Sequence, residues 1–151
     1  MIIKEKIKNI DINDKIFEEL KLEYKDFNTW FNKLIENDED CFITKNNDKL
    51  TSIMILKLNE KDSSQISYKD NVLKIRTLKV EDKNKGIGTS YMNIIHDLAV
   101  SNNIKYIYYT CNKNNKEFIN FTLKHNFKFY KEIKNEYIYL KELKWYNILR
   151  E

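Results

Sequence analysis

The sequence predicts one α/β domain of the α+β kind, residues 1–151, with one parallel crossover. Its length of 151 residues suits a single domain that buries its own core. Hydrophobic residues make up 42% of the chain and aromatic residues 13%, which is typical of a folded globule. Strand and helix periodicities follow the order β-α-α-β-β-β-α-β-α-β-β. The strand–helix–strand segment from Leu73 to Cys111 requires a right-handed parallel crossover. The strands that end at Val80 and Cys111 are therefore expected to be adjacent and parallel, and to diverge at their C-terminal ends.

The N-terminal half is expected to form a strand, two helices and a β-hairpin. Residues 1–7 alternate weakly, and Asn13 or Asp14 can cap the helical pattern that follows. A break near residues 25–26 divides that pattern into two helices. The strands of the hairpin are expected at 41–45 and 50–58, with a turn at 46–48.

The C-terminal half follows a polar stretch, residues 59–71, and alternates strands with amphipathic helices. Its elements are expected as a strand at 73–80, a helix at 89–100, a strand at 105–111, a helix at 115–125 and strands at 127–133 and 137–143. The last two strands are predicted to be antiparallel about a turn at 134–136.

The chain holds only two glycines, Gly86 and Gly88, where a strand pattern gives way to a helix pattern. Average usage would place roughly ten glycines in a chain of this length. Glycine is suited to backbone with φ > 0 and to close approach of a ligand. The loop at 81–88 therefore opens a helix whose first amides face an anion, above all a phosphate.

Three phosphate-binding patterns were compared with this loop. A Walker loop needs two glycines five positions apart and then Lys with Ser or Thr, and the sequence lacks it. The dinucleotide fingerprint needs a third glycine where Tyr91 stands, and an acid where Thr110 and Cys111 stand. The third pattern is a basic residue or Gln, two others, Gly, any residue, and Gly or Ala. Residues 83–88 satisfy it.

At this loop the chain resembles the GNAT superfamily of acyl-CoA N-acyltransferases. A second family motif agrees, because Asn115 opens a helix, Phe118 follows three residues later and Phe127 begins the next strand. Lys83 stands where Arg or Gln is commoner, and Asn126, which tolerates positive φ, stands where Gly is common. The resemblance implies a central mixed, mostly antiparallel sheet with helices on both faces.

The resemblance also implies how acetyl-CoA, the co-substrate, is held. Its pyrophosphate would rest on the amides of 85–89, its pantetheine arm would run beside 78–80, and Asn115 would contact it near the pantetheine end. The cofactor-binding residues expected on this basis are Leu78, Lys79, Val80, Lys83, Asn84, Lys85, Gly86, Ile87, Gly88, Thr89, Asn115 and Phe118.

The catalytic residues are less clearly indicated. In the family an amine attacks the thioester directly in a ternary complex, and many members place an acid Tyr on the second helix, five residues before the Phe. Thr122 holds that position here, so Tyr109 and Tyr130 are further candidates for the acid. A backbone amide near 78–80 would stabilise the oxyanion.

Neither a general base nor an acceptor is identified by the sequence. The strand before the loop presents Lys74 and Arg76 where some members carry Glu. His96 is expected to be solvated on the polar side of its helix. The acidic run at 36–40 is interpreted as a solvated turn, with attraction of a cationic amine as the alternative.

The charge pattern and the cysteines indicate which binding partners and metals to expect. The net charge of +4 comes from 27 basic and 23 acidic residues that are interleaved, which disfavours nucleic-acid binding. The two cysteines form no metal or redox motif, so no metal is expected. Without a secretory segment or an apolar run near 18 residues, a cytoplasmic location away from membranes is expected.

The predicted function is an acetyl-CoA-dependent N-acetyltransferase acting on an amine, and a homodimer is left open. The alternative is a non-catalytic GNAT-like domain that binds CoA, a protein or RNA.

Overall fold

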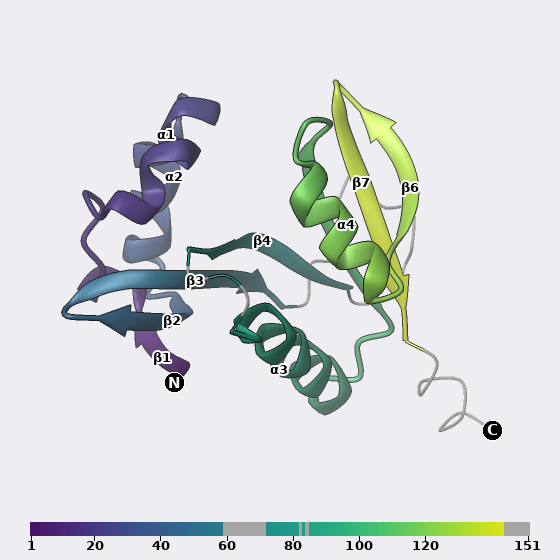
Figure 1. Ribbon diagram of the computed structural model, residues 1–151, viewed down its shortest axis with the longest axis horizontal. Helices are drawn as coiled ribbons and strands as arrows, with labels where there is room; N and C mark the ends of the chain where they lie inside the picture. Colours follow the sequence, from purple (N-terminus) through teal and green to yellow (C-terminus); the bar gives the residue numbers. More distant parts are fainter. Residues whose placement is uncertain (59–71, 82, 84, 144–151) are drawn as a thin grey trace. The chain divides into compact units, whose positions relative to one another are not determined.

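The computed structural model describes residues 1–58, 72–81, 83 and 85–143, and Figure 1 labels its elements. The strands are β1 (Ile3–Lys6), β2 (Asp40–Asn46), β3 (Lys49–Lys57), β4 (Val72–Val80), β5 (Tyr106–Asn112), β6 (Lys128–Ile133) and β7 (Glu136–Glu142). The helices are α1 (Glu18–Glu23), α2 (Phe27–Glu36), α3 (Ile87–Ser101) and α4 (Lys116–Lys124), and the 3₁₀ turns η1 (Ile7–Asn9) and η2 (Lys15–Phe17) precede α1. The predicted order of strands and α-helices is confirmed.

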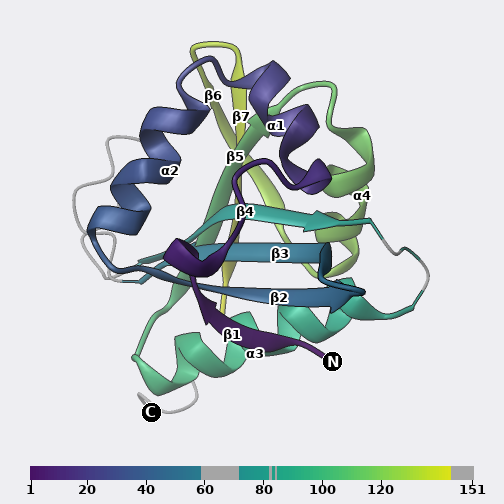
Figure 2. The ribbon, with the colours of Figure 1, turned by 90° about the vertical axis from the view of Figure 1, so that its left-hand side faces the viewer.

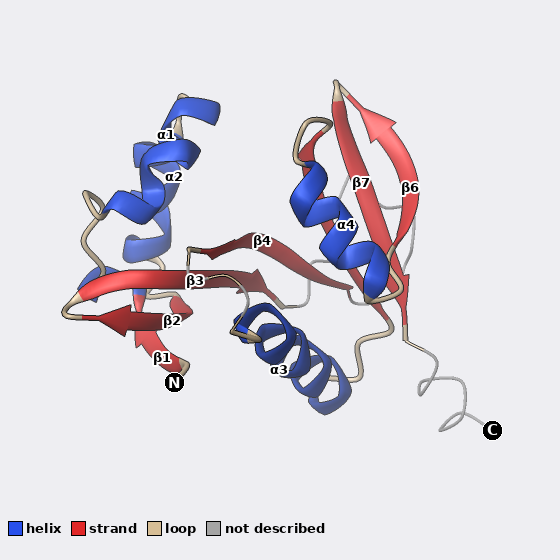
Figure 3. Ribbon diagram, viewed as in Figure 1, coloured by secondary structure: helices blue, strands red, loops and turns tan. Residues whose placement is uncertain are grey.

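The strands follow the order β1-β2-β3-β4-β5-β7-β6, in which neighbours are hydrogen-bonded (Figure 3). The pairs β1–β2, β2–β3, β5–β7 and β6–β7 are antiparallel, whereas β4 pairs with β5 in parallel. The sheet is therefore mixed and mostly antiparallel, as predicted.

The chain divides into two compact units. The first comprises Met1–Ile55 and Thr77–Tyr91, and the second comprises Leu56–Arg76 and Met92–Glu151. Three elements have residues in both units, because the division falls after Ile55 in β3, after Arg76 in β4 and after Tyr91 in α3.

The first unit is built on an antiparallel meander, in which β1, β2 and β3 lie side by side (Figure 2). Asn47 and Asp48 join β2 to β3 with φ of 53° and 66°. Positive φ at both central residues is the geometry that two-residue hairpins favour, and Asn and Asp tolerate it. The predicted hairpin is confirmed.

The helices of this unit bury an aromatic cluster. Asp14 caps η2, because its carboxylate accepts the Ile16 amide at 3.0 Å, and it also accepts the Leu50 amide at 3.1 Å. The ring centroids of Phe17 and Phe31 lie 5.4 Å apart in an edge-to-face contact. The predicted cap and the predicted break between α1 and α2 are both confirmed, although the first turn is 3₁₀ rather than α.

The second unit contains β5, β7 and β6 with the first residues of β4. The parallel ladder joins Val72 to Tyr106, Leu73 to Ile107 and Lys74 to Tyr108, so the predicted adjacent parallel strands are confirmed. Whether the two strands diverge beyond this ladder stays a prediction, because residues 77–80 belong to the first unit. The turn between β6 and β7 has φ of 48° at Lys134 and 68° at Asn135, at the predicted place.

Candidate functional site

The glycine loop leads from β4 into α3 within the first unit. Gly86 has φ of +73°, a conformation that side-chain-bearing residues rarely adopt, and a Cβ built there would meet no atom within 4 Å. Its carbonyl accepts the Ser90 amide at 3.0 Å, so Gly86 is the N-cap of α3. The helix starts at Ile87, two residues earlier than predicted.

This earlier start places Gly88 inside the first turn of α3. Helical backbone does not require glycine, and glycine costs about 1 kcal/mol relative to alanine in a helix interior. Ile87, Gly88 and Thr89 supply first-turn amides that have no acceptor within the helix. These residues are half-buried or exposed, so the turn is open to an anion. Gly86 is explained by its positive φ, whereas the helical backbone at position 88 gives no reason for glycine.

The loop is fixed at both ends to the β2–β3 hairpin. The Glu81 amide donates to the Thr51 carbonyl at 2.8 Å. On the far side of the loop the buried Tyr91 hydroxyl donates to the Phe42 carbonyl at 3.2 Å and lies 2.6 Å from Ser52 Oγ. Burial raises the pKa of Tyr91 to about 12, so the phenol keeps its proton at neutral pH.

The Tyr91 contact belongs to a chain of hydroxyls that sequence reasoning missed. Thr44 Oγ1 lies 2.6 Å from both Ser52 Oγ and Thr51 Oγ1. Because Tyr91 donates to a carbonyl, it accepts from Ser52, which accepts from Thr44, which accepts from Thr51. The direction of every bond is thereby set by the Phe42 carbonyl. No motif marks these residues, because they come from three separate elements.

The lysines predicted to bind the cofactor differ in their surroundings. Lys79 pairs with Glu19 of α1, and this pairing is the main reason why the pKa of Glu19 is lowered, with the nearby charge of Lys83 adding to it. Lys83 and Lys85 are exposed, and Leu78 and Val80 are half-buried. Asn84 lies outside the described residues. The Lys79 ammonium is therefore directed to α1 in this structure.

The acidic run that follows α2 is not a free anionic surface. Lys6 Nζ lies 3.2 Å from Asp38 Oδ2 and 3.1 Å from Asp40 Oδ1. These ion pairs agree with a structural turn rather than with the attraction of an amine.

In the second unit Asn115 stands at the N-cap of α4. Its carbonyl accepts the Ile119 amide at 3.1 Å, but its side chain makes no capping hydrogen bond. The side chain is exposed, so it is available for a ligand. Phe118 packs edge-to-face on Tyr109 with ring centroids 4.7 Å apart.

Thr122 and Tyr109 form a buried hydroxyl pair between α4 and β5. Their relative exposures are 0% and 1%, and their oxygen atoms are in direct contact. Thr122 Oγ1 donates its hydrogen to the Ile119 carbonyl at 3.0 Å. Tyr109 is therefore the donor in the hydrogen bond between the two hydroxyls. Burial raises the pKa of Tyr109. Both protons are therefore held inside the unit, which disfavours either residue as an acid in contact with substrate.

Tyr130 lies on the opposite face of the sheet in this unit. It packs against the buried cluster that contains Tyr106 and Tyr108, whereas Tyr109 is the next residue along β5 and faces the other way. The structure therefore brings Thr122 and Tyr109 together and separates Tyr130 from both.

Comparison with solved structures decides the fold. An N-acetyltransferase from Staphylococcus aureus Mu50 matches with a TM-score of 0.67 at 16% identity, over 95% of this chain and 98% of that one. PseH, an N-acetyltransferase from Campylobacter jejuni, matches with a TM-score of 0.58 at 17% identity, over 95% and 99%. Naa20 from Chaetomium thermophilum, in complex with a bisubstrate analogue, matches with a TM-score of 0.66 at 15% identity, over 100% and 90%. This chain has the GNAT acyltransferase fold.

The sequence itself matches no protein-family model and no curated protein. One substitution within the GNAT pattern is nevertheless explained. Asn126, which stands where the family commonly has glycine, has φ of 70° and supplies the same left-handed turn.

Other kinds of site are not indicated in the part of the chain that the structure describes. Across residues 1–58, 72–81, 83 and 85–143, no group of three or more His, Cys, Asp or Glu side chains is placed to hold a metal ion. The helices within these residues include none that is long and apolar enough to span a membrane. Cys41 and Cys111 are buried, and no disulfide joins them.

Proposed function

We propose that residues 1–151 form one acetyl-CoA-dependent N-acetyltransferase domain that acts on a primary amine of a small molecule or protein. Gly88 carries this proposal. It is one of two glycines in the chain, and it lies in helical backbone, where glycine is less favourable than alanine. A ligand that approaches the backbone of this turn accounts for it. The GNAT fold supplies the class of ligand, an acyl-CoA.

The pyrophosphate is proposed to accept hydrogen bonds from the amides of 85–89. Hydrogen bonds to a charged group contribute about 1.5–3 kcal/mol each, and the α3 dipole adds about 0.3–1 kcal/mol. The pantetheine arm is proposed to run beside 78–80, and Asn115 and Phe118 are the proposed contacts in the second unit. The bisubstrate analogues bound to Naa20 and to NAA60 of Arabidopsis thaliana support a site that takes donor and acceptor together.

The proposed reaction is direct attack of a neutral amine on the thioester carbonyl. A C–N bond forms, the C–S bond breaks, and the departing thiolate takes up the proton that the amine loses. A free thiol titrates near 8.5, so the thiolate leaves with little help from an acid. This matters because Thr122 and Tyr109, two of our three candidates for the acid, are buried, and Tyr130 faces away from them.

The burial of these hydroxyls also favours the second candidate function, a GNAT-like domain that binds CoA without turnover. The two functions differ in one observable, the release of free thiol. Both require CoA to bind at the glycine loop, so binding and turnover must be measured separately.

The test combines calorimetric titration of acetyl-CoA with a thiol-release assay across a panel of primary amines. Gly88→Glu adds a side chain and a negative charge at the pyrophosphate, and is expected to weaken binding by at least about a hundredfold. Gly88→Ala is the matched control for the fold, since alanine stabilises a helix and adds no charge. Unchanged affinity in a folded Gly88→Glu protein would overturn the loop assignment. Tight binding without turnover of any amine would establish the binding domain.

A further inference from the structure

His96 and Lys141 form a contact that the glycine-loop site does not use. Lys141 Nζ lies 2.9 Å from His96 Nε2, joining β7 to α3 within the second unit. The prediction that His96 is solvated is wrong, since both residues are half-buried. The helical position of His96 indicated only that it lies off the apolar stripe of its helix. The Lys141 side chain is long enough to reach the His96 ring from β7.

The surroundings of Lys141 disfavour its charged form. Within residues 1–58, 72–81, 83 and 85–143 no carboxylate forms an ion pair with it, whereas Lys105 on the neighbouring chain segment pairs with Glu142 at 3.5 Å. Burial lowers the pKa of the Lys141 ammonium. In the sheet Lys141 lies opposite Ile107, so one of its neighbours is an apolar side chain.

His96 is held in the form that accepts a proton. Burial, the charge of Lys141 and the charge of His125 at the end of α4 lower the pKa of His96, and only Asp97 opposes them. In the tautomer that carries its proton on Nδ1, a neutral His96 accepts an N–H of Lys141 at Nε2. An amine in hydrogen-bond contact with a neutral imidazole is the arrangement of a nucleophile and its base.

We propose that Lys141 is a self-acylation site, a nucleophilic lysine that takes an acyl group from a thioester with His96 as its base. The neutral amine attacks the carbonyl carbon, the C–N bond forms and the C–S bond breaks. The proton lost by nitrogen passes to His96 Nε2 and then to the departing thiolate. The products are an Nε-acyl-lysine and a free thiol.

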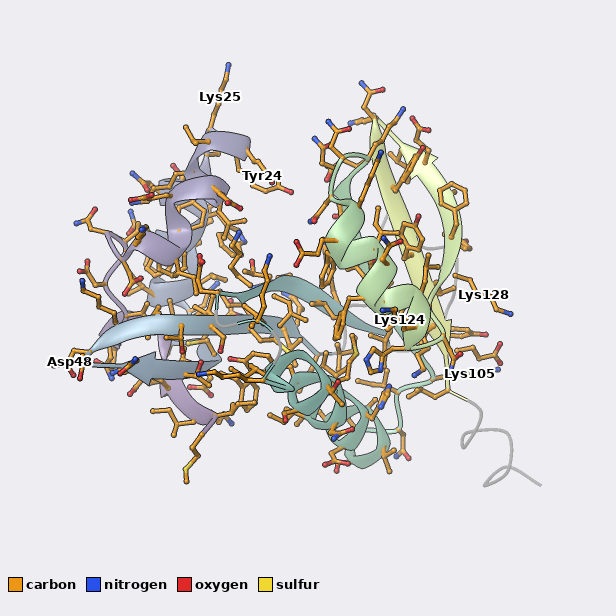
Figure 4. All side chains as sticks on the ribbon, viewed as in Figure 1. Tyr24, Lys25, Asp48, Lys105, Lys124 and Lys128 are labelled. Atoms are coloured by element: carbon orange, nitrogen blue, oxygen red, sulfur yellow. The ribbon has the colours of Figure 1, made fainter. Side chains whose placement is uncertain are left out.

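The chain offers a matched control on the adjacent strand. Lys128 of β6 lies opposite Leu140, one residue before Lys141, and its side chain points away from the ribbon (Figure 4). Lys128 is exposed, whereas Lys141 is half-buried against His96. The two lysines therefore lie on neighbouring strands and meet the same reagent, but Lys141 has an imidazole in contact with its amine and Lys128 is exposed.

The experiment treats the full chain with S-acetyl-N-acetylcysteamine, a thioester without a nucleotide, and follows each lysine by peptide mass spectrometry. The absence of a pyrophosphate separates this test from CoA binding, so the proposed function can fail without affecting it. Lys141 is expected to react about tenfold faster than Lys128, and His96→Asn is expected to remove about a tenfold advantage while Lys128 is unchanged. Lys141→Arg checks that the adduct is assigned to the right residue.

A Lys141 rate equal to or below that of Lys128 would overturn the proposal. So would a rate in folded His96→Asn protein that equals that of the parent. Where His96→Asn does not fold, the parent protein decides through its pH–rate profiles. The Lys141 profile is expected to have its midpoint at a lower pH than the Lys128 profile, and coincident midpoints would refute an activated amine.

Discussion

The glycine loop and the Tyr109–Thr122 pair show two ways in which this chain places polar groups. The loop presents backbone amides at an exposed helix start, and its geometry depends on Gly86, with φ of +73°. The hydroxyl pair is enclosed between α4 and β5, with every proton assigned to a protein acceptor. Backbone amides do not depend on a particular side chain, so the amides of the loop do not require the side-chain chemistry of the hydroxyl pair. We therefore expect variants in the two regions to separate binding from folding.

The largest effect is expected from Thr122→Val. It leaves the buried Tyr109 hydroxyl without its acceptor, which costs about 1–3 kcal/mol in the free energy of unfolding. Urea denaturation of the single variants and of the Thr122→Val, Tyr109→Phe double variant checks this, and the double variant is expected to recover most of the loss. Turnover per folded molecule is expected to change little. A hundredfold loss of turnover in Thr122→Ala would instead identify a general acid and break the comparison.

Gly86→Ala tests the backbone half of the comparison. The left-handed conformation costs an L-residue about 1–2 kcal/mol, and no atom within 4 Å blocks the added methyl group. The loss should appear in urea denaturation and be smaller for Gly86→Asn, because asparagine tolerates positive φ. Equal losses in the two variants would mean that something other than φ requires glycine.

Tyr91→Phe tests how the loop is anchored, and a smaller effect is expected. Without the Tyr91 hydroxyl, Ser52 can donate to Thr44 and Thr44 can donate to Thr51, which is half-buried. No buried donor is then left unpaired, so the cost is about 0.5–1.5 kcal/mol. Affinity for acetyl-CoA should fall by only about threefold, because the Glu81–Thr51 backbone bond remains. Calorimetric titration measures it, and a hundredfold loss would show that Tyr91 itself shapes the site.

The smallest effect is expected at the Lys79–Glu19 ion pair. Glu19 is mostly exposed, with 72% of its side chain accessible, and exposed ion pairs contribute little to stability. Lys79→Met should leave the affinity for acetyl-CoA within about twofold, since the ammonium is directed to α1. A double-mutant cycle with Glu19→Gln measures the coupling. A tenfold loss of affinity in Lys79→Met would show that this lysine turns to the pyrophosphate.

The sequence by itself determined the features that depend on a few neighbouring residues. Asp14 as a cap, the hairpin turn at Asn47 and Asp48, and the positive φ of Asn126 were all predictable, because local backbone preferences select those residue types. The glycine loop belongs to the same class. Its two glycines stand out against a chain that otherwise has none.

Only the tertiary structure decided which side chains meet. Thr122 and Tyr109 are 13 residues apart, and nothing in either local pattern shows that their hydroxyls form a hydrogen bond in the core. The contact of His96 with Lys141 spans 45 residues. Such contacts depend on how helices pack on strands far away in the sequence, which hydrophobic periodicity indicates only as a buried or an exposed face. The backbone geometry of the glycine loop is local, whereas the protonation of each candidate catalytic side chain depends on the packing around it.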